Sequence, residues 1–227
     1  MKPATLVTAL VTGSALVGAG YYLTRARARD RLALPGNVIS LITPSIDLRV
    51  AEHILAALQR IPGDEVTVLL HTGGGCVTSC VLIANALRDF RRSTAIVPYL
   101  AISGGTIIAL SANTLQMGRA AALSAVDPIV FGHRVRHLPA DTSLPPSNLA
   151  FAREYERAIA GYMRTTLAAR MPAATPAALD RALALFMGSD APHEWPIRRD
   201  DVIALGLPVL PAEPEWALMV DAERGRW

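Results

Sequence analysis

The sequence predicts an α/β fold with a mainly parallel sheet. Short apolar, β-branched segments alternate with amphipathic segments of helical length along residues 37–210, an order typical of βαβ units. Apolar residues make up 52% of the chain and aromatic residues only 5%, so Ala, Val, Leu and Ile must build the core. Two strand-to-helix junctions carry clustered glycines, at 73–75 and 104–105, and such turns meet at the carboxyl edge of a parallel sheet.

The first half of the soluble region alternates strands and helices. Residues 65–72 ("EVTVLLHT") are apolar on both faces, as in a buried parallel strand. Asp47 is positioned to cap the helix that it precedes. The predicted strands are residues 37–43, 65–72 and 93–102, with short strands around Gly118 within 114–130, and the predicted helices are residues 47–61, 76–90 and 104–113.

The second half is predicted to be mainly helical. Residues 133–147 are polar and contain three prolines, which predicts a mobile loop or lid. A long amphipathic helix follows over 148–170, and a second over 176–187 begins with proline and stops at a glycine. Residues 198–210 indicate a short helix, a glycine stop and a last strand.

The N-terminal segment has the features of a membrane anchor. Residues 4–23 carry no charge, and about 20 helical residues span the hydrocarbon core of a bilayer. Four arginines follow within 25–31, which favours an uncleaved anchor over a signal peptide and places the C-terminal side in the cytoplasm. We therefore divide the chain into an anchor with its basic flank, 1–32, and one domain, 33–227.

The charged residues and cysteines exclude several classes of function. The net charge is +3 and Lys2 is the only lysine, so neither nucleic-acid binding nor a lysine base in the soluble domain is expected. Cys76 and Cys80 are four apart on a predicted helix, which disfavours a disulfide, and no further ligands accompany them for a metal site. Both are expected to be small buried residues, and no cofactor or metal is expected.

Ser103 occupies a chemically suggestive position between a strand and a helix. A helix N-terminus exposes unpaired N–H groups, and the glycines behind this serine, in "LAISGGTII", allow a substrate to approach the backbone closely. The turn "LLHTGGGCV" (69–77) can supply N–H groups from a second direction. Two such donors near a nucleophile form an oxyanion hole, which typically contributes several kcal/mol to acyl transfer.

Other interpretations of these turns remain open at this point. Glycine-rich turns also bind phosphates, but a P-loop needs a lysine after its glycines and neither turn has the G-x-G-x-x-G dinucleotide pattern. Ser103 is equally consistent with a simple helix N-cap.

Four blocks together resemble the serine dehydrogenase proteinase family. They are "LLHTGGGCVTSCVLIANAL", "IVPYLAISGGTIIALSANTLQMG", "LSAVDP" and "HEWPI" with "ALGLPV". That family is a membrane-anchored branch of the ClpP/crotonase superfamily, related to signal peptide peptidase A. The resemblance covers roughly residues 37–210 plus the N-terminal helix, and it implies a ClpP/crotonase-like spiral of βαβ units.

The resemblance also implies a set of site residues. Ser103 matches the nucleophile, Asp127 in "AVDP" and His193 in "HEWPI" match its triad partners, and the backbone of Gly75 and Gly104 matches the oxyanion hole. His193 would take the serine proton, and Asp127 would fix the tautomer of the imidazole.

The chain departs from the family pattern in the loops around the site. Gly73 replaces a proline, and "LSAVDPIV" lacks a glycine and a final polar residue of the family block. Three other histidines compete with His193 as the base: His71 at the end of a strand, and His133 and His137, which lie 30 and 34 residues after the serine. Asp127 could equally start a turn, because Asp-Pro pairs often do.

The sequence thus predicts a membrane-anchored serine peptidase that hydrolyses peptides or membrane-protein segments. By resemblance, we expect a homo-oligomer, a trimer or multiples of one. A crotonase-like acyl-CoA enzyme and a catalytically inactive membrane scaffold of the same fold are the alternatives. An acyl-CoA enzyme would hold a thioester enolate in the same paired amides and would not need Ser103.

Overall fold

The central strand β2 (Glu65–Thr72) organises the sheet of this computed structural model, which describes residues 36–130, 133–138, 145–188 and 190–224. The whole length of β1 (Val38–Thr43) pairs with one side of β2. On its other side, β2 pairs first with β3 (Arg92–Val97) and then, at Thr72, with β4 (Leu100–Ala101). The sheet therefore divides near the carboxyl end of β2 and curls.

The sheet is mixed and runs in the order β10-β5-β3-β2-β4-β6-β9, with β1 on β2. All of its pairings are parallel except β6 with β9, which is antiparallel. Its remaining strands are β5 (Thr114–Met117), β6 (Ala122–Leu123), β9 (Ile197–Arg198) and β10 (Leu210–Pro211).

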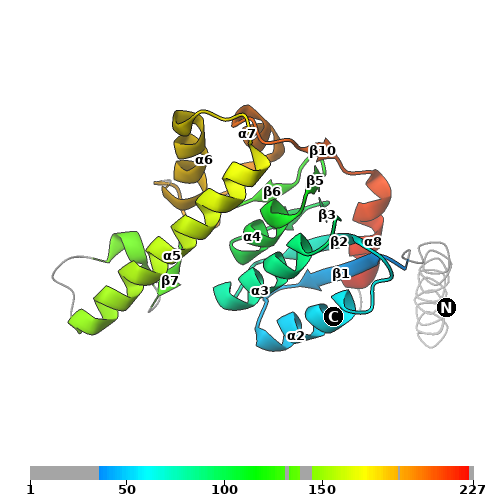
Figure 1. Cartoon of the computed structure of the whole chain (residues 1–227), viewed down its shortest axis with the longest axis horizontal. Coiled ribbons are helices and arrows are strands. Elements are labelled where there is room, and N and C mark those ends of the chain that lie inside the picture. Colours follow the sequence, from blue (N-terminus) through cyan, green and yellow to red (C-terminus); the bar gives the residue numbers. More distant parts are fainter. Residues whose placement is uncertain (1–35, 131–132, 139–144, 189, 225–227) are drawn as a thin grey trace, which may run out of the picture.

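Helices cover both faces of the sheet (Figure 1). Val66, Val68 and Leu70 of β2 enter the main core, which also takes buried residues from α2 (Leu48–Leu58), α3 (Val77–Arg88) and α4 (Gly104–Ser111). On the opposite face, Leu69 packs with Val220 of α8 (Pro214–Arg224) in a second cluster. The period of two along β2 thus sends alternate side chains to two different helical layers.

The helix α4 is buried along its whole length, and Ser103, the candidate nucleophile, immediately precedes it. All eight of its residues are buried, which explains why "GGTIIALS" contains no charged residue. Such a helix contributes apolar area all round rather than along one stripe. Its burial holds the turn before it in a fixed place.

A helical arm extends from the sheet. The helix α5 (Pro146–Arg170) runs diagonally across the molecule, and its N-terminal end lies beside the β7–β8 hairpin, away from the sheet (Figure 1). The hairpin strands are β7 (Ile129–Val130) and β8 (His133–Arg134), followed by a 3-10 turn, Val135–His137. The helices α6 (Pro176–Gly188) and α7 (Arg199–Ala204) complete the fold.

The predicted α/β class is confirmed, with three local corrections. The strand expected over 93–102 is broken between β3 and β4. Residues 133–137, predicted to be part of a mobile loop, form β8 and the 3-10 turn. The elements β9 and α8 were not predicted. The predicted anchor at 4–23 lies outside the described residues, and no helix among the residues that the structure describes is long and apolar enough to cross a bilayer.

Candidate active site

Ser103 stands on a strained turn between β4 and α4. Its φ of 53° and ψ of −118° make it the one non-glycine residue with a positive φ in the part of the chain that the structure describes. Such a backbone conformation costs on the order of 1–3 kcal/mol and persists only where the surroundings enforce it. Ser103 occupies the N-cap position of α4, but its side chain does not cap the helix. The simple N-cap interpretation is therefore wrong.

A buried hydrogen-bond network enforces the turn. The Ser103 amide donates to Ser124 Oγ at 2.8 Å. The Ser124 amide donates to Thr106 Oγ1 at 3.0 Å, and the Thr106 hydroxyl donates to the Ala101 carbonyl at 2.8 Å. Ser124 and Thr106 are both fully buried, so water does not compete for these bonds. They hold the start of α4 against the segment after β6.

The two glycine turns converge next to Ser103. A β-carbon at position 104 would lie 3.6 Å from the Gly75 nitrogen and 2.3 Å from the Cys80 sulfur. A β-carbon at position 74 would lie 2.8 Å from the Ser103 β-carbon and 3.0 Å from the Gly104 nitrogen. Glycine is required here because any side chain would separate the two turns.

The Gly75 and Gly104 amides have no partner among the described residues. Gly75 forms a parallel bridge with Ile46, made by the Gly74 carbonyl and the Cys76 amide at 2.7 and 2.8 Å. In a parallel pairing the amide of the residue between these two bonds faces away from the partner strand. Gly104 is the first residue of α4, whose N–H has no acceptor within the helix.

Asp127 and His193 form a buried pair. His193 Nδ1 lies 3.1 Å from Asp127 Oδ1, and the side chains are 9% and 1% exposed. The guanidinium of Arg134 donates from Nε to the other carboxylate oxygen of Asp127. Burial raises the pKa of Asp127, but the hydrogen bonds from His193 and Arg134 outweigh it, so the pKa is lower than usual. Asp127 is therefore ionised, and its side chain binds His193 and Arg134 instead of serving only to start a turn.

One pocket of about 360 Å³ brings the predicted residues together. Ser103, Asp127, His193 and Gly75 all line it. Gly104 lies directly beside Gly75, as described above. No hydrogen bond joins the Ser103 hydroxyl to an imidazole among the described residues, and contacts of this kind are often long before substrate binds. The arrangement gathers a hydroxyl, an imidazole–carboxylate pair and unpaired amides, which are the parts that acyl transfer requires.

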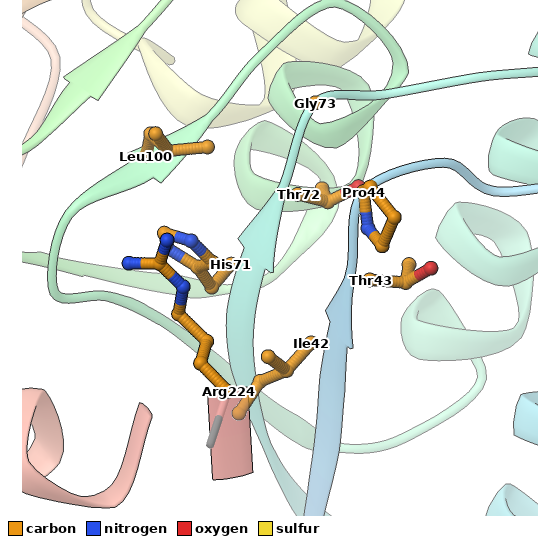
Figure 2. Close-up of a pocket in the computed structure, with 8 residues that line it drawn as sticks. All are labelled: Ile42, Thr43, Pro44, His71, Thr72, Gly73, Leu100 and Arg224. Carbon is orange, nitrogen blue, oxygen red and sulfur yellow. The ribbon is translucent and has the colours of Figure 1, made fainter. Parts of the chain in front are cut away.

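The other histidines lie elsewhere. His71 faces a separate pocket of about 410 Å³ with Leu100 and Arg224, and Figure 2 shows its ring beside the Arg224 side chain. Burial and Arg224 both lower the pKa of His71. His133 and His137 are exposed and do not line the Ser103 pocket. Of the four candidates, His193 alone shares a pocket with Ser103 within the described structure.

Two residues at the site were missed by sequence reasoning. Cys76, expected to be buried, is exposed and lines the Ser103 pocket, whereas Cys80 is buried as expected. Its position directly after Gly75 was the available signal. Arg134 fell within the segment predicted to be a loop, and a lone arginine there gives no sign of its partner. The described residues contain no group of three or more His, Cys, Asp or Glu side chains that could hold a metal ion.

Comparison with known proteins identifies the family. Residues 35–143 match the sequence model of ClpP-like SDH-type serine proteinases. This segment belongs to the serine dehydrogenase proteinase family. The family predicted from the sequence blocks is thereby confirmed, over a segment that includes Ser103 and Asp127 but ends before His193.

Individual relatives of this proteinase segment are distant or uncharacterized. Two uncharacterized proteins of Methanocaldococcus jannaschii, MJ0137 and MJ1495, are 41% and 36% identical over 85 residues, which is 37% of this chain. The match spans only 30% and 29% of their lengths. Among solved structures, a mutant of the membrane-bound stomatin-specific protease 1510-N is similar with a TM-score of 0.54 and 15% identity, covering 81% of each chain. That likeness shows that the fold is shared.

Proposed function

We propose that the protein is a serine peptidase with Ser103 as its nucleophile. His193 accepts the Ser103 proton, and Asp127 holds the imidazole in the tautomer that leaves Nε2 free to do so. The hydroxyl oxygen attacks a peptide carbonyl, and the Gly75 and Gly104 amides stabilise the resulting oxyanion. His193 returns the proton to the leaving amine, and water then releases the acyl-enzyme by the same steps.

One observation carries this proposal. Residues from four separate segments, around positions 75, 103, 127 and 193, line a single pocket beside a serine on a strained strand-to-helix turn. A serine raised on such a turn is the arrangement used by other hydrolases to expose a nucleophile above a sheet edge. The family match over 35–143 supports the same reaction class.

We further propose that the enzyme acts at a membrane. The uncharged run at 4–23 followed by arginines supports an uncleaved anchor with the peptidase domain in the cytoplasm. The structural relative 1510-N is named as membrane-bound and stomatin-specific. Its name supports peptides or exposed segments of membrane proteins as the substrate class here. Alkaline carbonate extraction of membranes tests the anchor: a full-length chain released into the supernatant would contradict it.

We also propose that the chain forms a homo-oligomer, either a trimer or a multiple of a trimer. It is supported by the projecting arm of α5, on which Phe151 is 56% exposed and stacks on Tyr155. Light scattering on the detergent-solubilised full chain measures the subunit number, and a monomeric mass would refute this part.

A serine-reactive fluorophosphonate probe tests the reaction. The native chain should be labelled, and Ser103→Ala should remove the label entirely. Ser45→Ala is the matched control, because Ser45 is exposed and lies outside the Ser103 pocket. An unlabelled native chain that binds coenzyme A would support the acyl-CoA alternative, and an unlabelled chain that does not would support the scaffold.

A further inference from the structure

Arg134 connects the two halves of the Asp127–His193 pair. It lies on β8 and is 9% exposed. Its Nε donates to Asp127 Oδ2, and its Nη1 donates to the Ala191 carbonyl at 2.6 Å. Ala191 is two residues before His193 in the segment between α6 and β9. One guanidinium thus holds both the carboxylate and the loop that carries the imidazole.

The two carboxylate oxygens of Asp127 have different partners. Oδ2 faces Arg134 and Oδ1 faces His193 Nδ1. A guanidinium is planar and permanently charged, so it fixes a carboxylate more rigidly than a rotatable hydroxyl or water would. With Oδ2 occupied, the carboxylate presents one oxygen to the imidazole in one orientation. The tautomer and the tilt of the His193 ring follow from that orientation.

We propose that Arg134 is a positioning residue of the peptidase site. It acts through Asp127 and the Ala191 carbonyl, and it sets the pH at which His193 can accept the Ser103 proton. This inference rests on the proposed function.

The charges around the pair determine the direction of that effect. Among the described residues, Arg134 from β8 contacts the pair, and the ionisable groups that line the same pocket are Glu194 beside His193, Tyr155 from α5 and Cys76 before α3. The guanidinium next to Asp127 offsets part of the negative charge that would stabilise an imidazolium. Removing it leaves the carboxylate unshared, so the imidazole should hold a proton up to higher pH.

Arg134→Gln and Arg134→Lys separate positioning from structure. Arg134→Gln should lower kcat/KM for a peptide substrate about 100-fold, the cost of a small misplacement of a catalytic group. It should also move the acid limb of the pH–rate profile upward by about one pH unit, because the neighbouring positive charge is lost. Arg134→Lys keeps the positive charge, so the acid limb of its pH–rate profile should lie at the same pH as in the native chain. Arg164→Gln is the control, because Arg164 pairs with Asp180 at the exposed surface.

A second measurement does not depend on turnover or on tolerance of the Gln variant. The ring of His193 can be titrated by NMR in Ser103→Ala, with Arg134 intact or replaced by Lys or Gln. Loss of Arg134 charge should shift that titration upward, and the Lys variant should titrate as the intact protein does. A titration and a pH profile that do not move in Arg134→Gln would overturn the inference, whatever the change in rate.

The two proposals fail in distinguishable ways. If the native chain hydrolyses peptide and Arg134→Gln keeps its pH profile, Arg134 is only structural and the peptidase assignment stands. If Ser103 is not labelled in the native chain at any pH, the peptidase assignment itself fails.

Discussion

His193 Nδ1 lies 3.1 Å from Asp127 Oδ1 although the two residues are 66 positions apart in the chain. The pair is buried, and Arg134 donates to the second carboxylate oxygen. Two hydrogen bonds to the ionised form outweigh burial and lower the pKa of Asp127. The carboxylate therefore stays charged through the neutral range and can orient the imidazole throughout it.

Replacing Asp127 by Asn should reduce activity far more than it changes the fold. An amide can donate to Nδ1, which would stabilise the wrong tautomer and leave a proton on Nε2. In a triad with this architecture, such a change lowers kcat by about 10⁴-fold. Steady-state hydrolysis of a peptide substrate by Asp127→Asn measures the effect. Activity within tenfold of the native chain would mean that Asp127 does not orient the base.

The lowered pKa of Asp127 also predicts that the stability of the fold decreases at acid pH. The folded-state pKa of Asp127 lies below its unfolded value of about 3.9. Its contribution to the free energy of unfolding is therefore complete above that value and is lost as the pH falls through the folded-state pKa. Urea unfolding of the native chain and of Asp127→Asn should show a difference in the free energy of unfolding that narrows as the pH falls from about 4 into stronger acid. A difference that widens below pH 4 would contradict this assignment.

Substitution of Gly104 tests the approach of the two glycine turns. A β-carbon at position 104 would lie 2.3 Å from Cys80 Sγ and 3.1 Å from Cys80 Cβ. Gly104→Ala should therefore lower the free energy of unfolding by about 1–3 kcal/mol, as overpacking does, and should weaken fluorophosphonate labelling. Cys80→Ala removes the sulfur, so the double variant should recover part of the stability. Thermal melts and probe labelling report the two effects.

Gly161 supplies the control for that experiment. It lies inside α5, and nothing stands within 4 Å of its ideal β-carbon. Gly161→Ala should raise stability by about 0.5–1 kcal/mol, because alanine is the better helix former, and should leave labelling unchanged. If Gly104→Ala and Gly161→Ala lowered the free energy of unfolding equally, the close approach of the two glycine turns would have no special role in stability.

Most of the strands and helices before residue 115 could be predicted, because their patterns are local. Residues 65–72 were expected to form a strand and do so with the same bounds. Asp47 was expected to cap a helix, and its carboxylate accepts from the Val50 amide at 2.9 Å. These features depend on residues a few positions apart, and neighbouring residues are what a sequence displays directly.

The later elements depend on distant partners and were harder to predict. The two-residue strand β9 exists because Ile197 and Arg198 pair with Leu123 and Ala122. The helix α8 has one fully buried residue, Val220, and its sequence gives a weak apolar stripe. In the site, Arg134 is fixed by Asp127 and by the Ala191 carbonyl, 57 residues away. No local pattern around Arg134 contains that information.

The environments of the two cysteines predict a selective thiol reaction in the active-site pocket. Cys76 is exposed there, and hydrogen bonding by the Ser79 amide lowers its pKa more than burial raises it. Burial raises the pKa of Cys80 to about 12. The thiolate is the reactive form, so N-ethylmaleimide should add once, at Cys76, and mass spectrometry of the peptides locates the adduct.

That adduct should also stop the enzyme. Cys76 directly follows Gly75 and shares the Ser103 pocket, so a succinimide group on its sulfur would occupy the space that a substrate carbonyl needs. Pretreatment should abolish fluorophosphonate labelling of the native chain. Cys76→Ser should remain labelled after the same treatment, because serine replaces the thiol without adding bulk and is favoured at a helix N-cap. Full labelling of the modified native chain would place Cys76 outside the path of the substrate.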